Sequence, residues 1–207
     1  KDNKLSIVAT DLDIIFYDEI TDVEIINEGS TTTSAAILYD ILRKISSNSK
    51  LNFDLKSENK LSLKSENADF NLLCLPTDNF PTFADEFEGK EIRLNNSRFL
   101  KLLNKTRISI SNDDTRHYLN GVFLHLTEAH GRNFLTGVAT DSHRLSSSSL
   151  EVENSSDFIS LILPRKTVFQ LSSLLAETNG QLTMQTSDNK IKFTVGNIKL
   201  ISKVIDG

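Results

Sequence analysis

Cysteine, glycine and long apolar runs are all scarce in this sequence of 207 residues. The single cysteine, Cys74, excludes an internal disulfide and any zinc site built from several cysteines. It lies in an apolar run, which favours a buried, inert thiol, and a reducing cytoplasmic setting fits this pattern. No apolar run approaches about 18 residues, the length that a membrane-spanning helix requires, so we expect no membrane partner.

Several kinds of functional motif are also missing. The eight glycines form no phosphate-binding loop, and the Gly-x-Ser-x-Gly motif of hydrolases does not occur. The histidines have none of the spacings of known metal sites, and they are His117, His125, His130 and His143. We therefore expect neither a metal nor another cofactor. The first 20 residues lack the basic segment and apolar block of a signal peptide, so we expect none.

The overall charge is acidic, with a formal net charge of −5. Taken alone, this balance argues against a nucleic-acid-binding protein. A hydrophobic content of 38% and a charged content of 25% are typical of a globular protein. The length is sufficient for one large domain or two ordinary ones. The distribution of the charge along the chain is therefore more informative than its sum.

The sequence repeats itself at a constant offset of 130 residues, without gaps, at three separate places. The matched segments are residues 3–11 with 133–141, 34–45 with 164–175, and 57–60 with 187–190. The first pair shares Asn, Leu, Val, Ala, Thr and Asp, and the second pair shares an apolar stripe at helical spacing. The third pair is a polar turn between alternating runs, which predicts a β-hairpin in each copy. The offset thus indicates two copies of one domain.

The repeat predicts a first domain over residues 1–85 and a second over residues 86–207. The second copy has about 40 residues without a counterpart, so we expect the first domain to lack its opening helix and strands. A weaker repeat, residues 92–102 with 161–171, divides the domain into two half-units of strand, helix and further strands. The prediction is an α+β fold in which each domain packs two helices on antiparallel sheets. The linker, residues 76–90, contains Phe80, Phe83 and Phe87, which favours packing onto a domain.

The segment from Ser97 to Arg107 predicts a helix with one apolar face and one basic face. The basic face contains three side chains, Arg98, Lys101 and Lys105. No acidic residue occurs in the segment. One interpretation is an ordinary solvated face. The other is a face directed toward a polyanion, where lysine and arginine replace the counterions of phosphates.

Basic residues also mark the other predicted helices and one loop. Arg43 and Lys44 end one helix, where a positive charge suits the helix dipole, and Arg165 with Lys166 begins another. The predicted loop of residues 112–121 contains Arg, His and Tyr side chains that could contact phosphates or stack on bases. A plain surface turn explains that loop more simply.

The densest cluster of reactive side chains is Thr140 to Leu145. Asp141, Ser142 and His143 suggest a catalytic triad, but triad members come from separate elements that converge in space. A surface imidazole and an arginine in an ion pair are simpler interpretations. In the first copy, Leu12-Asp13-Ile14 stands where the second copy has Ser142-His143-Arg144. The shared Ala-Thr-Asp is therefore predicted to be scaffold, and the unshared residues to have a specialised function.

Four segments together resemble the middle domain of the bacterial sliding clamp, which is the beta subunit of the DNA polymerase III holoenzyme. They are Arg116–Gly121, Thr140–Leu145, Pro164–Lys166 and, at the end of that domain, Ser202–Gly207. The resemblance covers nearly the whole chain. Residues 1 to about 85 are similar to the later part of the first clamp domain, and residues from about 90 onward to the second.

The resemblance implies a processivity factor for DNA replication without catalytic activity. In this family two full-length chains close into a ring of six domains, whose helices face non-specifically bound duplex DNA and whose sheets form the outer wall. The implied DNA-binding residues are Arg98, Lys101, Lys105, Arg116, His117, Tyr118, Arg165 and Lys166. The replicative polymerase, the clamp loader, and other polymerases and repair proteins are the implied partners.

These partners bind through short peptides, and the resemblance implies a pocket for them in the second domain. Its expected members are Leu119, Thr140, Ser142, His143, Arg144 and Leu145. The chain departs from the family pattern at Ser142, where glycine is usual, and at His117, where tyrosine is common. Ala36 and Ile37 replace basic residues that many members have early in the first helix.

Two other interpretations remain open from the residues alone. One is a hydrolase in which Asp141 and His143 act as acid and base. The other is a protein-binding module without any role on DNA. Removing the His143 imidazole distinguishes a hydrolase, which would lose hydrolysis, from a peptide-binding pocket. Reversing the charge of the basic helix tests whether the protein has a role on DNA.

Overall fold

The computed structural model describes residues 3–81, 87, 91–153 and 158–205, and it divides into two compact units. The first unit contains the described residues up to Leu5 and residues 20–81. The second contains residues 6–19 and the described residues from 87 onward. Within these residues, no helix combines the length and apolar character needed to cross a membrane.

The first unit consists of a four-stranded antiparallel sheet and one helix. Its elements are β3 (Thr32–Thr33), α1 (Ala35–Leu42), β4 (Asn52–Ser57), β5 (Lys60–Ser65), β6 (Ala68–Leu75) and the 3-10 helix η1 (Thr77–Asn79). The sheet order is β3-β6-β5-β4, and the predicted hairpin is confirmed as the pair β4–β5. The predicted helix is confirmed as α1, with the Ser34 hydroxyl accepting the backbone N–H of Ile37 at 3.5 Å.

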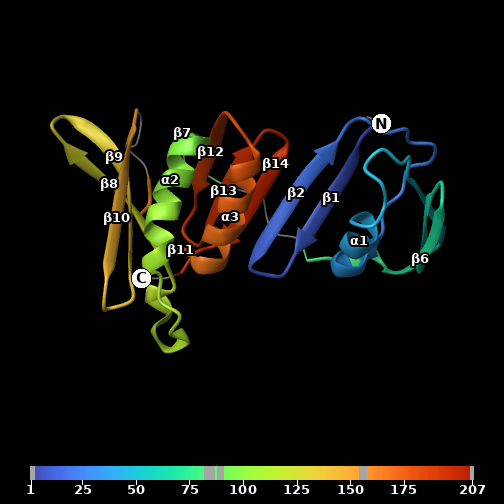
Figure 1. The fold of residues 1–207 in the computed structure, drawn as a ribbon, viewed down its shortest axis with the longest axis horizontal. Helices are drawn as coiled ribbons and strands as arrows, with labels where there is room; N and C mark the ends of the chain where they lie inside the picture. Colours follow the sequence, from blue (N-terminus) through green and yellow to red (C-terminus); the bar gives the residue numbers. More distant parts are fainter. Residues whose placement is uncertain (1–2, 82–86, 88–90, 154–157, 206–207) are drawn as a thin grey trace. The chain divides into compact units, whose positions relative to one another are not determined.

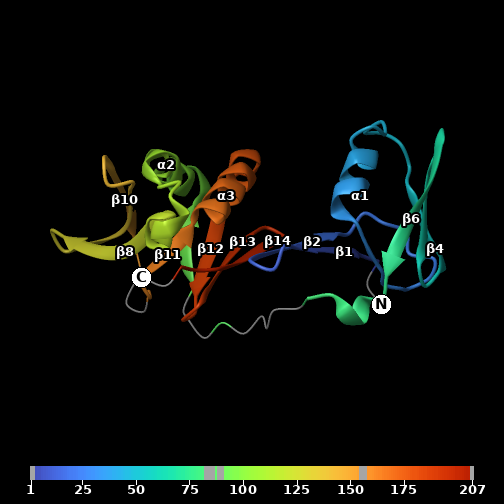
Figure 2. The ribbon, with the colours of Figure 1, turned by 90° about the horizontal axis from the view of Figure 1, so that it is seen from below.

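The core of the first unit is small and includes the chain's cysteine. Leu38 and Ile41 of α1 pack against buried Leu61, Leu72 and Cys74. The free thiol of Cys74 is buried, which confirms the expectation from its apolar surroundings. One stripe of α1 thus faces the sheet, beside which the helix lies in Figure 2. The rest of the helix is solvent-exposed.

The second unit contains two helices and two antiparallel sheets, as predicted for an α+β clamp-like domain. Its helices are α2 (Asn96–Thr106) and α3 (Arg165–Glu177), which lie side by side in Figures 1 and 2. One sheet has the order β10 (Leu145–Val152), β9 (Arg132–Thr140), β8 (Gly121–Ala129), β11 (Leu161–Pro164). The other has the order β1 (Leu5–Thr10), β2 (Ile14–Ile20), β14 (Ile198–Lys203), β13 (Lys190–Val195), β12 (Gln181–Thr186), β7 (Ile92–Asn95).

The two half-units of the second domain exchange their first strands. Strand β7 precedes α2 in the chain but pairs with β12 of the later half, whereas β11 precedes α3 and pairs with β8 of the earlier half. Both predicted strand–helix units are present, and the hairpin β12–β13 is confirmed. The exchange closes each sheet with a strand from the other half, so neither half can complete its sheet alone.

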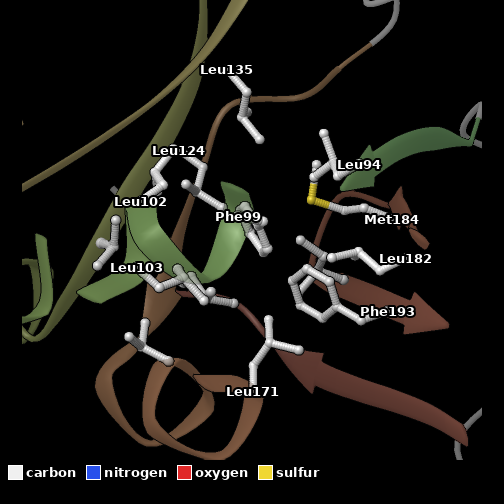
Figure 3. Packing of buried hydrophobic residues seen from close by; sticks show 14 of the residues in the cluster. Leu94, Phe99, Leu102, Leu103, Leu124, Leu135, Leu171, Leu182, Met184 and Phe193 are labelled. Carbon is white, nitrogen blue, oxygen red and sulfur yellow. The ribbon is translucent and has the colours of Figure 1, made fainter. Parts of the chain in front are cut away.

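One continuous apolar core lies between the helices and sheets of the second unit (Figure 3). Phe99 of α2 and Phe193 of β13 approach with ring centroids 6.0 Å apart. The apolar face predicted for the basic helix is confirmed, because Phe99, Leu102 and Leu103 are all buried. Gly137 of β9 permits this packing, since a Cβ there would lie 2.6 Å from Cδ2 of Leu102.

The segments between the predicted elements differ in detail from the sequence-based expectations. Residues 114–119 form a 3-10 helix, η3 (Asp114–Leu119), rather than an irregular loop, because the Asp113 carboxylate caps its first turn by accepting the N–H of Thr115 at 3.0 Å. In the linker, Phe83 lies outside the described residues. Phe87 packs in the second unit, where Nζ of Lys192 lies 4.5 Å from its ring centroid.

Candidate functional site

The turn between β9 and β10 is built by two side chains that bond back to its own backbone. The Thr140 hydroxyl donates to the carbonyl of Arg144 at 2.8 Å and accepts the N–H of Ser142 at 3.1 Å. Oδ1 of Asp141 accepts the backbone N–H groups of His143 and Arg144, both at 3.0 Å. Threonine and aspartate favour such local bonds, so this pair of residues specifies a tight, hydrogen-bonded turn.

The first copy of the repeat forms the same turn with the same bonds. The Thr10 hydroxyl donates to the carbonyl of Ile14 at 2.9 Å and accepts the N–H of Leu12 at 3.0 Å. Oδ1 of Asp11 accepts the N–H groups of Asp13 and Ile14 at 3.1 and 3.0 Å. The prediction that the shared Thr-Asp pair is scaffold is therefore confirmed.

The third residue of each turn has a backbone conformation that residues other than glycine rarely adopt. Leu12 has a φ of 78° and Ser142 a φ of 77°, both in the left-handed region that glycine adopts without cost. At Ser142 the side chain makes a bond that Leu12 cannot make, because its hydroxyl accepts Nη1 of Arg116 at 2.7 Å. The two copies thus share a strained turn and differ in what the strained residue contacts.

The unshared residues present different surfaces in the two copies. Ile14 is buried, with 7% of its surface exposed, whereas the equivalent Arg144 is exposed and pairs through Nε with Oδ2 of Asp141 at 3.0 Å. The adjacent Leu145, which pairs in register with Thr140, exposes 66% of its surface. The second copy therefore displays an exposed leucine beside an arginine and an imidazole.

The carboxylates of both turns are held in their ionised form. At Asp141 the backbone N–H groups of His143 and Arg144, together with the Arg144 guanidinium, lower the pKa below its ordinary value of 3.8. At Asp11 partial burial raises the pKa, but bonds from Lys166 and from two backbone N–H groups outweigh it and lower the pKa overall. Lys166 reaches Asp11 through an ion pair in the second unit. Both carboxylates act as acceptors that stabilise structure.

The hydrogen bonds of the turn do not form a catalytic triad. The Asp141 carboxylate is bonded to backbone N–H groups and to Arg144, and the Ser142 hydroxyl is bonded to Arg116. A triad requires the carboxylate to orient an imidazole that in turn contacts the nucleophile. Among the described residues, no cluster of three or more His, Cys, Asp or Glu side chains could hold a metal ion.

Arg116 connects the 3-10 helix η3 to the turn. Its Nε donates to Oδ2 of Asp113 at 2.9 Å while Nη1 reaches Ser142, and its φ of −113° and ψ of 62° interrupt the helical conformation. The resemblance to the clamp family assigned Arg116 to the DNA-binding residues and Ser142 to the peptide-binding residues. The structure brings the two side chains together, so the two predicted sites adjoin at this guanidinium.

The neighbouring residues His117, Arg165 and Lys166 line one hollow of about 480 Å³. The start of α3 is fixed beside η3, because the N–H of Arg165 donates to the carbonyl of Asn120 at 2.8 Å. His117 and Tyr118 contact each other edge to face, with ring centroids 5.9 Å apart, and both are exposed. Three of the predicted DNA-binding residues therefore surround one solvent-accessible space.

The basic face of α2 is exposed along the helix. Arg98, Lys101 and Lys105 are all exposed, opposite the buried apolar residues. Asn95 caps the helix by accepting the N–H of Arg98 at 3.1 Å, so the basic residues begin within its first turn. The sequence-based division of this helix into two faces is confirmed.

One aromatic residue of this layer was missed by the sequence-based prediction. Phe169 of α3 lies under two guanidinium groups, with Cζ of Arg107 5.3 Å and Cζ of Arg165 5.5 Å from its ring centroid. Arg165 and Phe169 are four residues apart in a predicted helix, a spacing that could have indicated their contact. The approach of Arg107, the residue that follows α2, could not be read from the sequence.

Comparison with known protein families gives two matches that together span most of the chain. The N-terminal domain of the DNA polymerase III beta subunit matches residues 1–84, and the central domain of the same subunit matches residues 93–207. The beta sliding clamp of Caulobacter vibrioides is 32% identical over 208 residues, covering 99% of this chain and 55% of the relative. This chain thus spans about 55% of the length of that relative.

Solved structures of sliding clamps have the same fold. A crystal structure of the Caulobacter crescentus beta sliding clamp is similar with a TM-score of 0.94 and 32% identity, covering 100% of this chain and 55% of that one. A Bartonella birtlesii sliding clamp bound to griselimycin is similar with a TM-score of 0.91 and 33% identity, again covering 100% and 55%.

Proposed function

The chain belongs to the DNA polymerase III beta subunit family, and we propose that it is part of a sliding clamp that holds replication proteins on DNA. In this proposal, residues 1–85 and 86–207 belong to the first and second clamp domains, and two full-length chains form the ring. The clamp has no catalytic role and acts in the cytoplasm, where bacterial DNA is replicated.

The proposed DNA-facing surface consists of the helix layer of the second unit. Its members are Arg98, Lys101, Lys105, Arg116, His117, Tyr118, Arg165 and Lys166. The exposed basic face of α2 supports the proposal, because it concentrates positive charge in an acidic chain, and the hollow beside α3 adds Arg165 at a solvent-accessible position. Contacts to phosphates alone are independent of sequence, which permits a clamp to slide.

The proposed peptide-binding site comprises Leu119, Thr140, Ser142, His143, Arg144 and Leu145. The observation that carries it is the contrast between the two copies of one turn. The bonds are the same, but the second copy exposes Arg144 and Leu145 at the two positions where the first copy buries Ile14 and Ile15. An apolar side chain and an arginine stem on a rigid turn form a suitable wall for the anchors of a short peptide. The replicative polymerase, the clamp loader and repair proteins are the proposed sources of such peptides.

Griselimycin is a suitable probe for this site, because clamps from Bartonella birtlesii and Pseudomonas aeruginosa bind it in solved structures. Calorimetric titration of the chain should give saturable binding. Leu145→Ala should weaken the affinity at least about fivefold, as expected for loss of a central apolar contact.

Leu75→Ala is the matched control, because Leu75 of β6 exposes 71% of its surface compared with 66% for Leu145. It should leave the affinity unchanged. Equal affinity of Leu145→Ala and the wild type would refute the assignment of this turn as the binding wall. An ester-hydrolysing activity of the chain that His143→Ala abolishes would instead support a hydrolase.

A further inference from the structure

Aromatic side chains occupy equivalent, exposed positions on α1 and α3. Tyr39 and Phe169 are related by the same 130-residue offset that relates the two domains. Neither ring is needed for the core, because both are exposed; Phe169 exposes 40% of its surface. The two copies of the helix therefore present the same kind of side chain at the same surface position.

In both helices the exposed ring contacts arginine. Cζ of Arg43 lies 5.4 Å from the ring centroid of Tyr39, within the first unit. In the second unit, Phe169 contacts two arginines, Arg107 from the end of α2 and Arg165 from the first turn of α3, at 5.3 and 5.5 Å. These distances are within the range of cation–π attraction. The repeated feature is therefore an aromatic ring that holds guanidinium groups.

Among the residues that the structure describes, the two guanidinium groups around Phe169 have no ion-pair partner. Neither α2 nor the first turn of α3 contains an acidic side chain. Two like charges on one ring repel each other, and an anion placed between them would offset that repulsion. Guanidinium groups bind phosphate oxygens through paired N–H donors, so a phosphodiester backbone is the matching ligand.

We propose that Phe169 is a positioning residue that holds Arg107 and Arg165 together as a contact for the phosphodiester backbone of duplex DNA, with Tyr39 holding Arg43 in the equivalent helix. The proposal rests on the proposed DNA-facing role of the helix layer. The ring restricts the rotamers of two long side chains before DNA arrives, which reduces the entropy lost on binding. It adds Arg107, Phe169, Tyr39 and Arg43 to the residues that act on DNA.

The test measures binding of the chain to a fluorescently labelled duplex by anisotropy at a series of low salt concentrations. Phe169→Leu keeps an apolar side chain but removes the ring, and it should weaken binding about two- to fivefold. Phe169→Tyr keeps the ring and should bind as the wild type does. Arg107→Ala should lower the slope of log affinity against log salt by about 0.9, the value for one lost phosphate contact.

Two matched controls are available on the β8–β9 hairpin. Phe123 exposes 41% of its surface, and Arg132 pairs with Glu151 away from the helices. Phe123→Leu should leave the affinity unchanged, and Arg132→Ala should leave the salt slope unchanged. Thermal unfolding of each variant checks that the fold is intact.

The outcomes separate this inference from the proposed function. If the wild-type chain shows no salt-dependent binding to the duplex, the DNA-facing role and the inference both fail. If the wild type binds and Phe169→Leu binds equally well, only the inference fails. If Phe169→Leu retains its full effect in the Arg107→Ala, Arg165→Ala background, the ring does not act through these arginines and the inference is overturned.

Discussion

Single residues determine the turn between β9 and β10, and its stability should depend on pH. The Asp141 carboxylate accepts two backbone N–H groups and pairs with Arg144, and these contacts lower its pKa from the ordinary value of 3.8. A lowered pKa in the folded state stabilises the fold above the unfolded-state value, and this stabilisation is lost as the pH falls through the folded-state pKa. The free energy of unfolding should therefore decrease as the pH falls below about 4.

Asp141→Asn tests this contribution, because asparagine keeps an acceptor oxygen but has no titrating charge. Chemical denaturation of the variant and the wild type should give stabilities that differ at neutral pH and converge as the pH falls through the lowered folded-state pKa of Asp141. A constant difference across this range would show that the carboxylate's ionisation does not contribute. Asp11→Asn should behave in the same way, since the pKa of Asp11 is also lowered.

The sequence predicted the scaffold of this turn but not its conformation. Threonine and aspartate at the same positions of both copies indicated a shared structure, because these side chains bond to nearby backbone. The serine itself gives no sign of the left-handed conformation at position 142, since serine and leucine rarely adopt it; only the glycine that is usual there in the resembled family fits it. The bond between Ser142 and Arg116 joins segments 26 residues apart, so no local pattern could indicate it.

Strands β8 and β11 lie close together where β8 begins. Gly121 pairs in register with Pro164, and a Cβ at Gly121 would collide with the carbonyl oxygen of Leu163 and lie 2.7 Å from Cγ2 of Ile162. The oxygen belongs to the backbone of a buried strand and cannot move away without disturbing the sheet. The glycine in the Arg-His-Tyr-Leu-Asn-Gly segment is thus required by strand pairing.

Gly121→Ala should destabilise the second unit by about 2 kcal/mol, the typical cost of overpacking. Gly29→Ala is the control, because no atom lies within 4 Å of the position its Cβ would occupy. Urea denaturation should show a lower midpoint for Gly121→Ala and little change for Gly29→Ala. An unchanged midpoint for Gly121→Ala would mean that β8 and β11 can separate at low cost.

Helices and hairpins were predictable because their signals are local, whereas the pairing between them was not. The period of apolar residues located α2 and α3, and alternation around polar turns located β4–β5 and β12–β13. The exchange of β7 and β11 between half-units depends on contacts between distant segments. The same limit applied to the approach of Arg107 to Phe169, which joins two helices.

The distribution of charge in the second unit reconciles an acidic chain with the proposed DNA-facing role. The net charge is −5, yet the exposed face of α2 is basic and contains no acid. A clamp that encircles DNA does not need high affinity, because its retention depends on closure rather than on contact energy. Weak, local positive charge is sufficient to guide the duplex through the ring.

Topological closure makes a distinct prediction for the full-length polypeptide. Once loaded on circular duplex DNA, it should remain bound when the salt concentration is raised, because screening weakens contacts but does not open a ring. Cutting the circle once should release it, since a clamp slides off a free end. Gel filtration of labelled protein with circular and linearised plasmid measures both fractions.

Reversing the basic face of α2 tests which surface meets the DNA. Arg98→Glu, Lys101→Glu and Lys105→Glu combined should reduce the amount of protein loaded, because the duplex then meets a repulsive wall. Reversing Lys56, Lys60 and Lys64 of the β4–β5 hairpin makes the same change in net charge at another surface and should leave loading unchanged. An equal reduction of loading in both triple variants would show that total charge, and not the face of α2, governs the interaction, and wild-type loading of both would show that the face of α2 does not meet the DNA. Release of the wild type from intact circles by salt alone would show that binding is electrostatic and that no closed ring forms.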